Sequence, residues 1–283
     1  MGAAVTLYTS ITWNSSNTNI ASVGTNGLVT AGSTNGTADI QFYNSSAKSR
    51  VIFSAKSLLG ALDLTGATDL VSVPHNNSLE PGSNFTLEMW VRFPNGVSGS
   101  IILEKAAPDG TGRYSYSLNM NSNGRLAFFR QNANANKLES FIANTAFPTD
   151  GNWHHVAVTR SFASNTGTIR MLIDGTPYTN FLTTSGITND TASNTQALSI
   201  GAKSDGADNA NLQIDEIRLW NETKAASYFT AATRNNPVAA PYPTALKAYF
   251  KMDKINLLKV SNEITTAASG TLENMTGQEL VSR

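Results

Sequence analysis

Cysteine is absent from this 283-residue chain, and charged residues are scarce. Without cysteine there is no disulfide scaffold, no thiolate metal site and no cysteine nucleophile. Charged residues make up 14% of the chain, well below the ~25% of an average soluble domain. Lysine plus arginine and aspartate plus glutamate number 20 each. Because no net charge attracts nucleic acid or acidic lipid, we expect no nucleic-acid partner.

Long hydrophobic runs are also missing. No apolar stretch approaches the ~20 residues that span a bilayer, so we expect no membrane insertion. Residues Met1–Ser10 have neither the basic start nor the apolar centre of an export signal, so we expect no signal peptide in this chain. The chain is then either a piece of a longer secreted protein or one that reaches its place without secretion, as phage virion proteins do. In both cases the expected location is extracellular, on a cell surface or a virion surface.

Asn, Ser, Thr and Gly supply the polarity that charged residues do not. This mixture is typical of extracellular β proteins, whose turns need residues that tolerate positive φ and whose strands favour Thr. The clearest strand is Phe85–Phe93, where every second residue is apolar. From Ala61 onward, strands recur at regular spacing with turn signals between them. The pattern predicts an all-β fold, an antiparallel β-sandwich.

The stretch Gly151–Tyr178 predicts a central hairpin of this sandwich. Two apolar, β-branched runs, Trp153–Arg160 and Thr168–Ile173, flank a polar turn. A second turn follows at Asp174-Gly175, a dipeptide typical of tight hairpin turns.

Six phrases of the sequence carry a family resemblance: ALDLTG, NFTLEMWVRF, GNWHHVAVTR, LIDG, LSIGA and IDEIRLWN. They follow the order found in laminin-G-like modules of the concanavalin A-like lectin/glucanase class, so residues 58–222 resemble such a module. The resemblance implies a jelly-roll β-sandwich and names no ligand. The phrase ITWNSSNTNIASVGTNGLVTAGSTNGTADI is similar to the second half of a bacterial group-2 immunoglobulin-like domain.

We therefore expect a small, partial Ig-like β-domain over residues 1–55 and a jelly-roll domain over residues 56–283. The second domain is expected to include one short helix at 222–235, Ala-rich and ended by Asn235-Asn236-Pro237. A C-terminal strand segment at 244–283 is expected to pack back on the sandwich or, alternatively, to open a further repeat.

The first domain lacks the one or two strands that precede the ITW strand in its relatives. A sandwich with a missing strand exposes backbone N–H and C=O groups that another strand can pair. We expect a strand from a neighbouring subunit, from an upstream part of a longer polypeptide or from the C-terminal segment to complete it. A smaller sheet that needs fewer strands is the alternative.

Hydrolysis requires two carboxyl groups about 5–9.5 Å apart across a glycosidic bond. The glucanase relatives carry an ExDxxE-like strand, and no such strand occurs here. Glu88 is followed at alternate positions by Trp90 and Arg92, and Asp215 and Glu216 are adjacent. No GxSxG elbow is present either. We expect the protein not to be an enzyme.

Two groups of residues are candidates for binding. Glu88, Trp90 and Arg92 share the polar face of one strand, where an aromatic ring beside polar groups suits a sugar. Alternatively, loops cover this face and Trp90 packs beneath them. The family resemblance implies a structural Ca²⁺ at Asp215, with carbonyl oxygens from the turn that contains Gly66. Oxygen ligands suit this ion. A hydrogen bond from Asp215 to local backbone is the competing interpretation.

These observations predict a non-enzymatic binding or adhesion module on a bacterial surface protein or a phage virion. Its expected partner is a glycan or a surface protein, with neighbouring subunits as further partners through strand complementation. The alternative is a purely structural role as a capsid decoration or fibre subunit. A glycoside hydrolase is the third and weakest interpretation.

Overall fold

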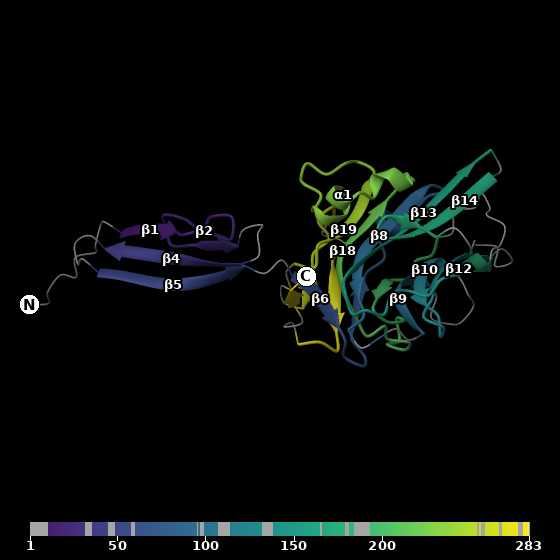
Figure 1. Ribbon diagram of the computed structural model, residues 1–283, viewed down its shortest axis with the longest axis horizontal. Coiled ribbons are helices and arrows are strands. Elements are labelled where there is room, and N and C mark those ends of the chain that lie inside the picture. Colours follow the sequence, from purple (N-terminus) through teal and green to yellow (C-terminus); the bar gives the residue numbers. More distant parts are fainter. Residues whose placement is uncertain are drawn as a thin grey trace, which may run out of the picture. The chain divides into compact units, whose positions relative to one another are not determined.

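The computed structural model describes residues 11–31, 36–44, 49–57, 60–94, 96, 99–106, 114–131, 138–164, 166–178, 181–183, 193–253, 255, 258–265, 268–276 and 280–282. The chain divides into two compact units whose main bodies are residues 1–59 and 60–281, labelled by element in Figure 1. Among the described helices, none is long and apolar enough to cross a membrane.

The first unit contains a three-stranded antiparallel sheet in the order β1-β4-β5 and a two-stranded hairpin, β2-β3. Its strands are β1 (Ile11–Ser15), β2 (Ala21–Val23), β3 (Val29–Ala31), β4 (Gly36–Asn44) and β5 (Ser49–Ser57). Four residues form a small core, against which Trp13 packs: Ile20, Ala21, Ala38 and Ile40. The predicted strand pattern is present. Residues 1–10 lie outside the described residues, so strand completion stays a prediction.

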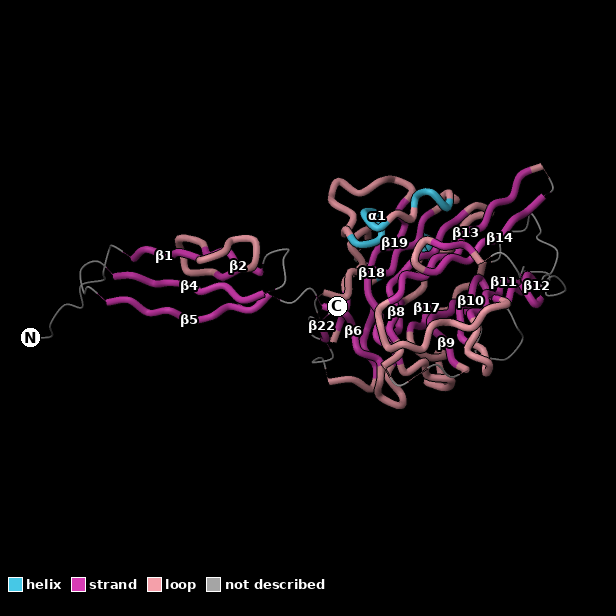
Figure 2. The backbone as a smooth tube through the Cα atoms, in the orientation of Figure 1, coloured by secondary structure: helices cyan, strands magenta, loops and turns pink. Residues whose placement is uncertain are grey.

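Two large antiparallel sheets make up the second unit, which confirms the predicted jelly-roll sandwich. Almost all of this unit is strand and loop (Figure 2). The order of the nine-stranded sheet is β16-β12-β11-β10-β9-β17-β7-β21-β20. Its strands are β7 (Leu70–Val73), β9 (Ser100–Ala106), β10 (Tyr114–Met120), β11 (Leu126–Gln131), β12 (Leu138–Ala143), β16 (Phe181–Thr183), β17 (Leu198–Ile200), β20 (Lys259–Val260) and β21 (Gly270–Glu273).

The second sheet runs in the order β15-β14-β13-β8-β18-β6-β22, and β19 pairs with β18 beyond the end of β6. Its strands are β6 (Gly60–Leu64), β8 (Phe85–Arg92), β13 (His154–Ala163), β14 (Thr166–Ile173), β15 (Thr176–Pro177), β18 (Leu212–Trp220), β19 (Leu246–Phe250) and β22 (Leu280–Ser282). The C-terminal segment thus supplies strands to both sheets, because β21 pairs with β7.

The core lies between the two sheets and follows the predicted alternation. In β8 the inner row is fully apolar and at most 3% exposed: Phe85, Leu87, Met89, Val91 and Phe93. Each such side chain stabilises the fold by about 1.5–3 kcal/mol relative to an exposed one. The outer row of β8 is polar, so this strand fixes which side chains face away from the core.

Strand β18 departs from strict alternation. Its inward residues are Leu212, Ile214, Ile217 and Leu219, so one step spans three residues instead of two. The register between β18 and β8 shifts between Asp215 and Arg218, and Glu216 has a φ of 52°. This is a β-bulge, which inserts an extra residue into one strand. Asp215, which lies opposite Trp90, therefore does not share a face with Ile217 and Leu219, although simple alternation along the strand would place all three together.

The predicted helix at 222–235 is also wrong in its extent. The structure has a short 3₁₀ turn, η2 (Ala226–Tyr228), and a five-residue helix, α1 (Ala231–Asn235). Thr230 between them is extended, and its hydroxyl accepts a hydrogen bond of 3.3 Å from the Thr233 amide. A threonine hydroxyl in this role begins a new helix rather than continuing an old one. Tertiary packing of Phe229 against Ala157 and Leu172 then holds the break.

Candidate functional site

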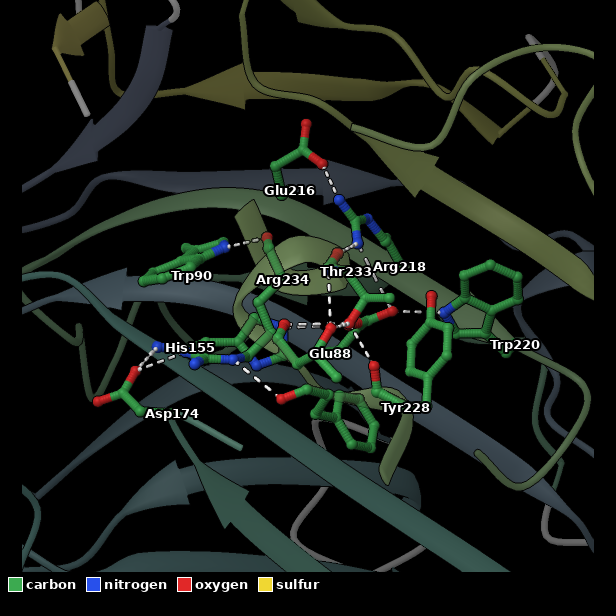
Figure 3. A network of polar contacts seen from close by, with 12 residues as sticks. Glu88, Trp90, His155, Asp174, Glu216, Arg218, Trp220, Tyr228, Thr233 and Arg234 are labelled. Atoms are coloured by element: carbon green, nitrogen blue, oxygen red, sulfur yellow. Dashed lines mark hydrogen bonds and ion pairs between the residues drawn. The ribbon is translucent and has the colours of Figure 1, made fainter. Parts of the chain in front are cut away.

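Polar side chains gather on the outer face of the eight-stranded sheet, away from the core (Figure 3). The strand register brings them together: Trp90 of β8 lies opposite His155 of β13, and Glu88 lies opposite Arg218 of β18. Glu88, His155 and Arg218 are each at most 1% exposed, although all are polar. Buried charges are tolerated only when they are paired and hydrogen-bonded, so their partners decide what the cluster does.

Glu88 is the centre of this network. Its Oε1 accepts a hydrogen bond of 2.7 Å from the indole nitrogen of Trp220, and its Oε2 lies 3.0 Å from His155 Nε2. The Arg218 guanidinium is 3.8 Å from Oε1. Both carboxylate oxygens are therefore occupied by protein groups.

Arg218 links the sheet to the segment above it. It is paired with Glu216, and it donates hydrogen bonds to the carbonyl oxygens of Thr233 (3.3 Å) and Asn236 (3.0 Å). Burial lowers the pKa of Arg218, but Glu88 and Glu216 outweigh it and leave the pKa above its usual value. Tyr249 of β19 donates a 2.6 Å hydrogen bond to the same Glu216 carboxylate. The guanidinium is permanently charged and is paired with two buried acids at once.

Residues 222–236, here called the covering segment, lie over this face of the sheet. The indole nitrogen of Trp90 donates a hydrogen bond of 2.9 Å to the carbonyl oxygen of Arg234. The Phe229 ring packs against His155, with ring centroids 5.9 Å apart. The covering segment is thus held by hydrogen bonds from the sheet and by one buried aromatic ring.

The two neighbouring histidines point to opposite sides of their strand, because successive side chains of a strand alternate. His155 joins the outer network, and its pKa is lowered because burial disfavours the charged ring more than Glu88 favours it. The His154 ring packs on Phe147 of the core, at 5.4 Å. His154 lies between Asp174 (2.7 Å) and Asp150 (3.0 Å). Burial lowers the His154 pKa, but these two carboxylates raise it above its usual value.

The structure brings the predicted residues Glu88, Trp90 and Arg92 to one face. Of the two interpretations of that face, it shows the second: Trp90 packs beneath the covering segment. Arg92 also has an internal partner: its Nε donates a hydrogen bond of 2.7 Å to the carbonyl oxygen of Gly151. These internal partners favour a covered face over an open sugar platform, and a sugar site at the three residues stays a prediction.

The structure does not bring the predicted calcium residues Asp215 and Gly66 together. Ile214 pairs with Leu62 and Leu212 with Leu64, so Asp215 follows one end of this strand pair and Gly66 follows the other. Asp215 lies three residues beyond Leu212, the partner of Leu64, and three residues of a strand span roughly 10 Å. The turn from Leu64 to Gly66 increases this separation. Asp215 Oδ1 accepts a hydrogen bond of 2.8 Å from the Glu216 amide. The Gly66 amide donates a hydrogen bond of 2.8 Å to Asp69 Oδ2. In the described part of the chain, no three His or acidic residues are placed to hold a metal ion. The pair does not fit a shared calcium site.

The second unit also has a surface groove of about 490 Å³, which no sequence pattern predicted. Its walls come from residues before β19, from the loop after β20 and from the 3₁₀ turn η1 (Asn77–Leu79). The lining residues are Asn76, Ser78, Tyr242, Pro243, Thr244, Leu246, Lys247, Glu263, Ile264 and Thr265. No local sequence pattern marks this groove, because its walls come from three parts of the chain that are distant in sequence.

Two antiparallel sheets packed face to face, with a segment covering one of them, define the class of lectin-like jelly-roll sandwiches. The family described as the concanavalin A-like lectin/glucanases superfamily matches residues 65–227. The match covers more than half of the chain, and the chain belongs to this family. No curated protein sequence matches this chain.

Three solved structures that are similar to this chain are distant in sequence. A Bacteroides ovatus protein with a proposed carbohydrate-binding role has 16% identity and a TM-score of 0.56, over 95% of this chain and 78% of that one. A heptameric SAP-like pentraxin from Limulus polyphemus has 14% identity and a TM-score of 0.40, over 76% of this chain and 99% of that one. The NanB sialidase of Streptococcus pneumoniae has 17% identity and a TM-score of 0.42, over 66% of this chain and 30% of that one. At these identities the likeness concerns the fold alone.

Proposed function

We propose that this protein is a non-enzymatic module that binds glycan at a cell surface or a virion surface. Membership of a lectin and glucanase family supports a carbohydrate partner. The proposed role of the Bacteroides ovatus protein, which shares the fold over 95% of this chain, supports it further.

One observation favours binding over hydrolysis. The two acids that come together on the covered sheet face, Glu88 and Glu216, are both buried and both paired with Arg218. A glycosidase needs one carboxyl to exchange a proton and the other to reach the sugar carbon or a water. Carboxylates held by a shared guanidinium beneath a covering segment do neither.

The test is a glycan array probed with the labelled full chain, followed by a hydrolysis assay on every glycan that is bound. We expect binding to at least one class of glycan and no turnover. Glu88→Gln, Asp215→Asn and Glu216→Gln therefore have no hydrolytic activity to abolish. Turnover that one of these substitutions removes would overturn the non-enzymatic proposal, and an array without any binding would overturn the glycan proposal.

A structural role as a capsid decoration or fibre subunit is the second candidate, and the first unit favours it. In the described residues, β1 and β5 are the outer strands of their sheet and each pairs with β4 alone. Ile11 and Ile52 of these strands are 46% and 48% exposed. Exposed edges recruit further strands. We propose that a strand from a neighbouring subunit adds to this sheet.

Amide hydrogen exchange tests the strand addition across Ile11–Phe53. Residues 1–55 expressed alone should show less protection in β1 and β5 than the same residues in the assembled full-length protein. Equal protection in the two samples would contradict the proposal.

A further inference from the structure

The groove of about 490 Å³ lies largely outside the family-matched part of the chain, because most of its lining residues follow residue 227. Its volume falls within the ~300–1,000 Å³ of ordinary ligand pockets. This inference rests on the proposed glycan-binding function and asks where the glycan binds.

The walls of the groove are fixed by contacts within the second unit. The Tyr242 hydroxyl donates a hydrogen bond of 3.1 Å to Glu263 Oε2, and its ring meets Tyr249 edge-on at 5.9 Å. The Ile264 amide donates a hydrogen bond of 3.1 Å to Asn262 Oδ1. On the opposite wall, Asn76 caps η1 by accepting 2.9 Å from the Ser78 amide. The groove therefore exists before any ligand arrives, which reduces the entropy lost on binding.

Several polar groups of the lining keep hydrogen-bonding capacity in the described part of the chain. The Ser78 hydroxyl is buried and has no hydrogen-bond partner there. Lys247 makes no ion pair with another described residue, although it is only partly exposed. Glu263 has one oxygen engaged by Tyr242, and Lys251 lies 3.8 Å from the same oxygen. Because the Ser78 oxygen has almost no accessible surface, the groups that a ligand atom can reach are the Glu263 carboxylate and the Lys247 ammonium.

The chemistry of the lining selects among ligand classes. A phosphate or nucleic-acid ligand needs clustered cations, and Lys247 is the one cation among the ten lining residues. An apolar ligand would desolvate the Glu263 carboxylate and the Lys247 ammonium without offering either a hydrogen bond. A sugar ring presents an apolar face for an aromatic wall and hydroxyl groups for a carboxylate, an amide and an ammonium. The lining offers all of these, with one positive and one negative charge.

We propose that this groove is the glycan-binding site and holds a neutral pyranose ring. Tyr242 forms the aromatic wall. Glu263 accepts hydrogen bonds from ring hydroxyls, and Lys247 donates hydrogen bonds to others.

The experiment titrates methyl glycosides of neutral hexoses and N-acetylhexosamines into the ¹⁵N-labelled full chain, beside the glycan array. Tyr242→Ala should weaken binding at least tenfold, whereas Tyr242→Phe should keep most of it. Glu263→Gln should weaken binding about three- to tenfold, since an amide replaces two acceptors by one. Tyr43→Ala, at a tyrosine that is 43% exposed in the first unit, is the matched control and should bind normally.

A blocking variant keeps the test decisive if Tyr242→Ala does not fold. Thr244 lines the groove and is exposed, so Thr244→Arg should fill the groove without disturbing the core. It should abolish binding, and Ser227→Arg at another exposed position should not. If Thr244→Arg and Glu263→Gln both bind as tightly as the wild type, the groove assignment is wrong. The glycan-binding function would still stand in that case. Absence of wild-type binding to every glycan and glycoside would overturn both.

Discussion

The indole nitrogen of Trp220 donates a hydrogen bond of 2.7 Å to the carboxylate of Glu88, two strands' side chains meeting beneath the covering segment. The same carboxylate faces His155 and Arg218. A buried acid with three partners stabilises the fold only while all of them are in place.

We therefore expect Glu88→Gln to destabilise the second unit by about 2–4 kcal/mol, because it removes one member of a buried charge network and leaves one acceptor oxygen for the ring nitrogens of Trp220 and His155. Glu222→Gln is the control: Glu222 pairs with Lys224 at the surface, where its side chain is 44% exposed. Such a surface pair contributes about 0–1 kcal/mol. Urea unfolding followed by tryptophan fluorescence measures both variants. Equal effects would show that the buried network contributes nothing beyond an ordinary surface pair.

Gly175 carries a different constraint, since it fits against the covering segment. It has a φ of 80°, and a Cβ atom there would lie 2.3 Å from the carbonyl oxygen of Phe229. Gly206 has a φ of 81° with no atom within 4 Å of the same added carbon. Both substitutions to alanine carry the left-handed backbone cost of about 1–2 kcal/mol.

Gly175→Ala should therefore destabilise the protein by clearly more than Gly206→Ala, and it should raise hydrogen exchange in residues 226–235. The matched φ values make the difference between the two variants a measure of the clash alone. If the two variants have the same melting temperature, the covering segment shifts to accept the added carbon. The close approach of Gly175 to the Phe229 carbonyl oxygen then does not affect stability.

The neighbouring histidines predict opposite pH dependences. The folded-state pKa of His155 is lowered by burial, so the unfolded chain binds more protons below about pH 6.5. Stability from neutral His155 is present above that pH and is lost as the pH falls through it. The pKa of His154 is raised by Asp150 and Asp174 against the effect of burial. Its contribution is full below about pH 6.5 and is lost as the pH rises through the folded-state pKa.

His155→Gln should therefore cost more stability at pH 8 than at pH 5.5, and His154→Gln should cost more at pH 5.5 than at pH 8. Urea unfolding of both variants and the wild type at the two pH values gives the comparison. Because the residues are adjacent in one strand, each serves as the control for the other. The same sign of pH dependence in both variants would refute the assignment.

Calcium binding is a prediction that the strand register weakens. If Asp215 and Gly66 held calcium together, chelation would lower the melting temperature by removing a ligand of the folded state. Since the two residues lie at opposite ends of their strand pair, we expect excess chelator to shift the melting temperature by less than about 1 °C. Elemental analysis of the purified protein accompanies the melt. A larger decrease that Asp215→Asn abolishes would restore the calcium site.

The sequence by itself determined the sandwich and its inner face. Alternation in Phe85–Phe93 depends only on the period of a strand, so it survives in any tertiary setting, and all five inward residues are buried. The Asp174-Gly175 turn is equally local: both residues have positive φ in the structure, which this dipeptide tolerates. The opposite orientation of His154 and His155 follows from the same strand geometry.

Only the tertiary structure decided which polar face is buried and where the groove lies. Alternation places Glu88 and Trp90 on the outer face of their strand. It does not reveal that residues 222–236 return to cover that face. The bulge at Glu216 changes the inward row of β18, and no local pattern announces it. The groove joins Asn76 to Glu263, which are far apart in sequence and meet because β19 pairs with β18. Long-range contacts of this kind depend on how the sheets close, and local propensity carries no information about that closure.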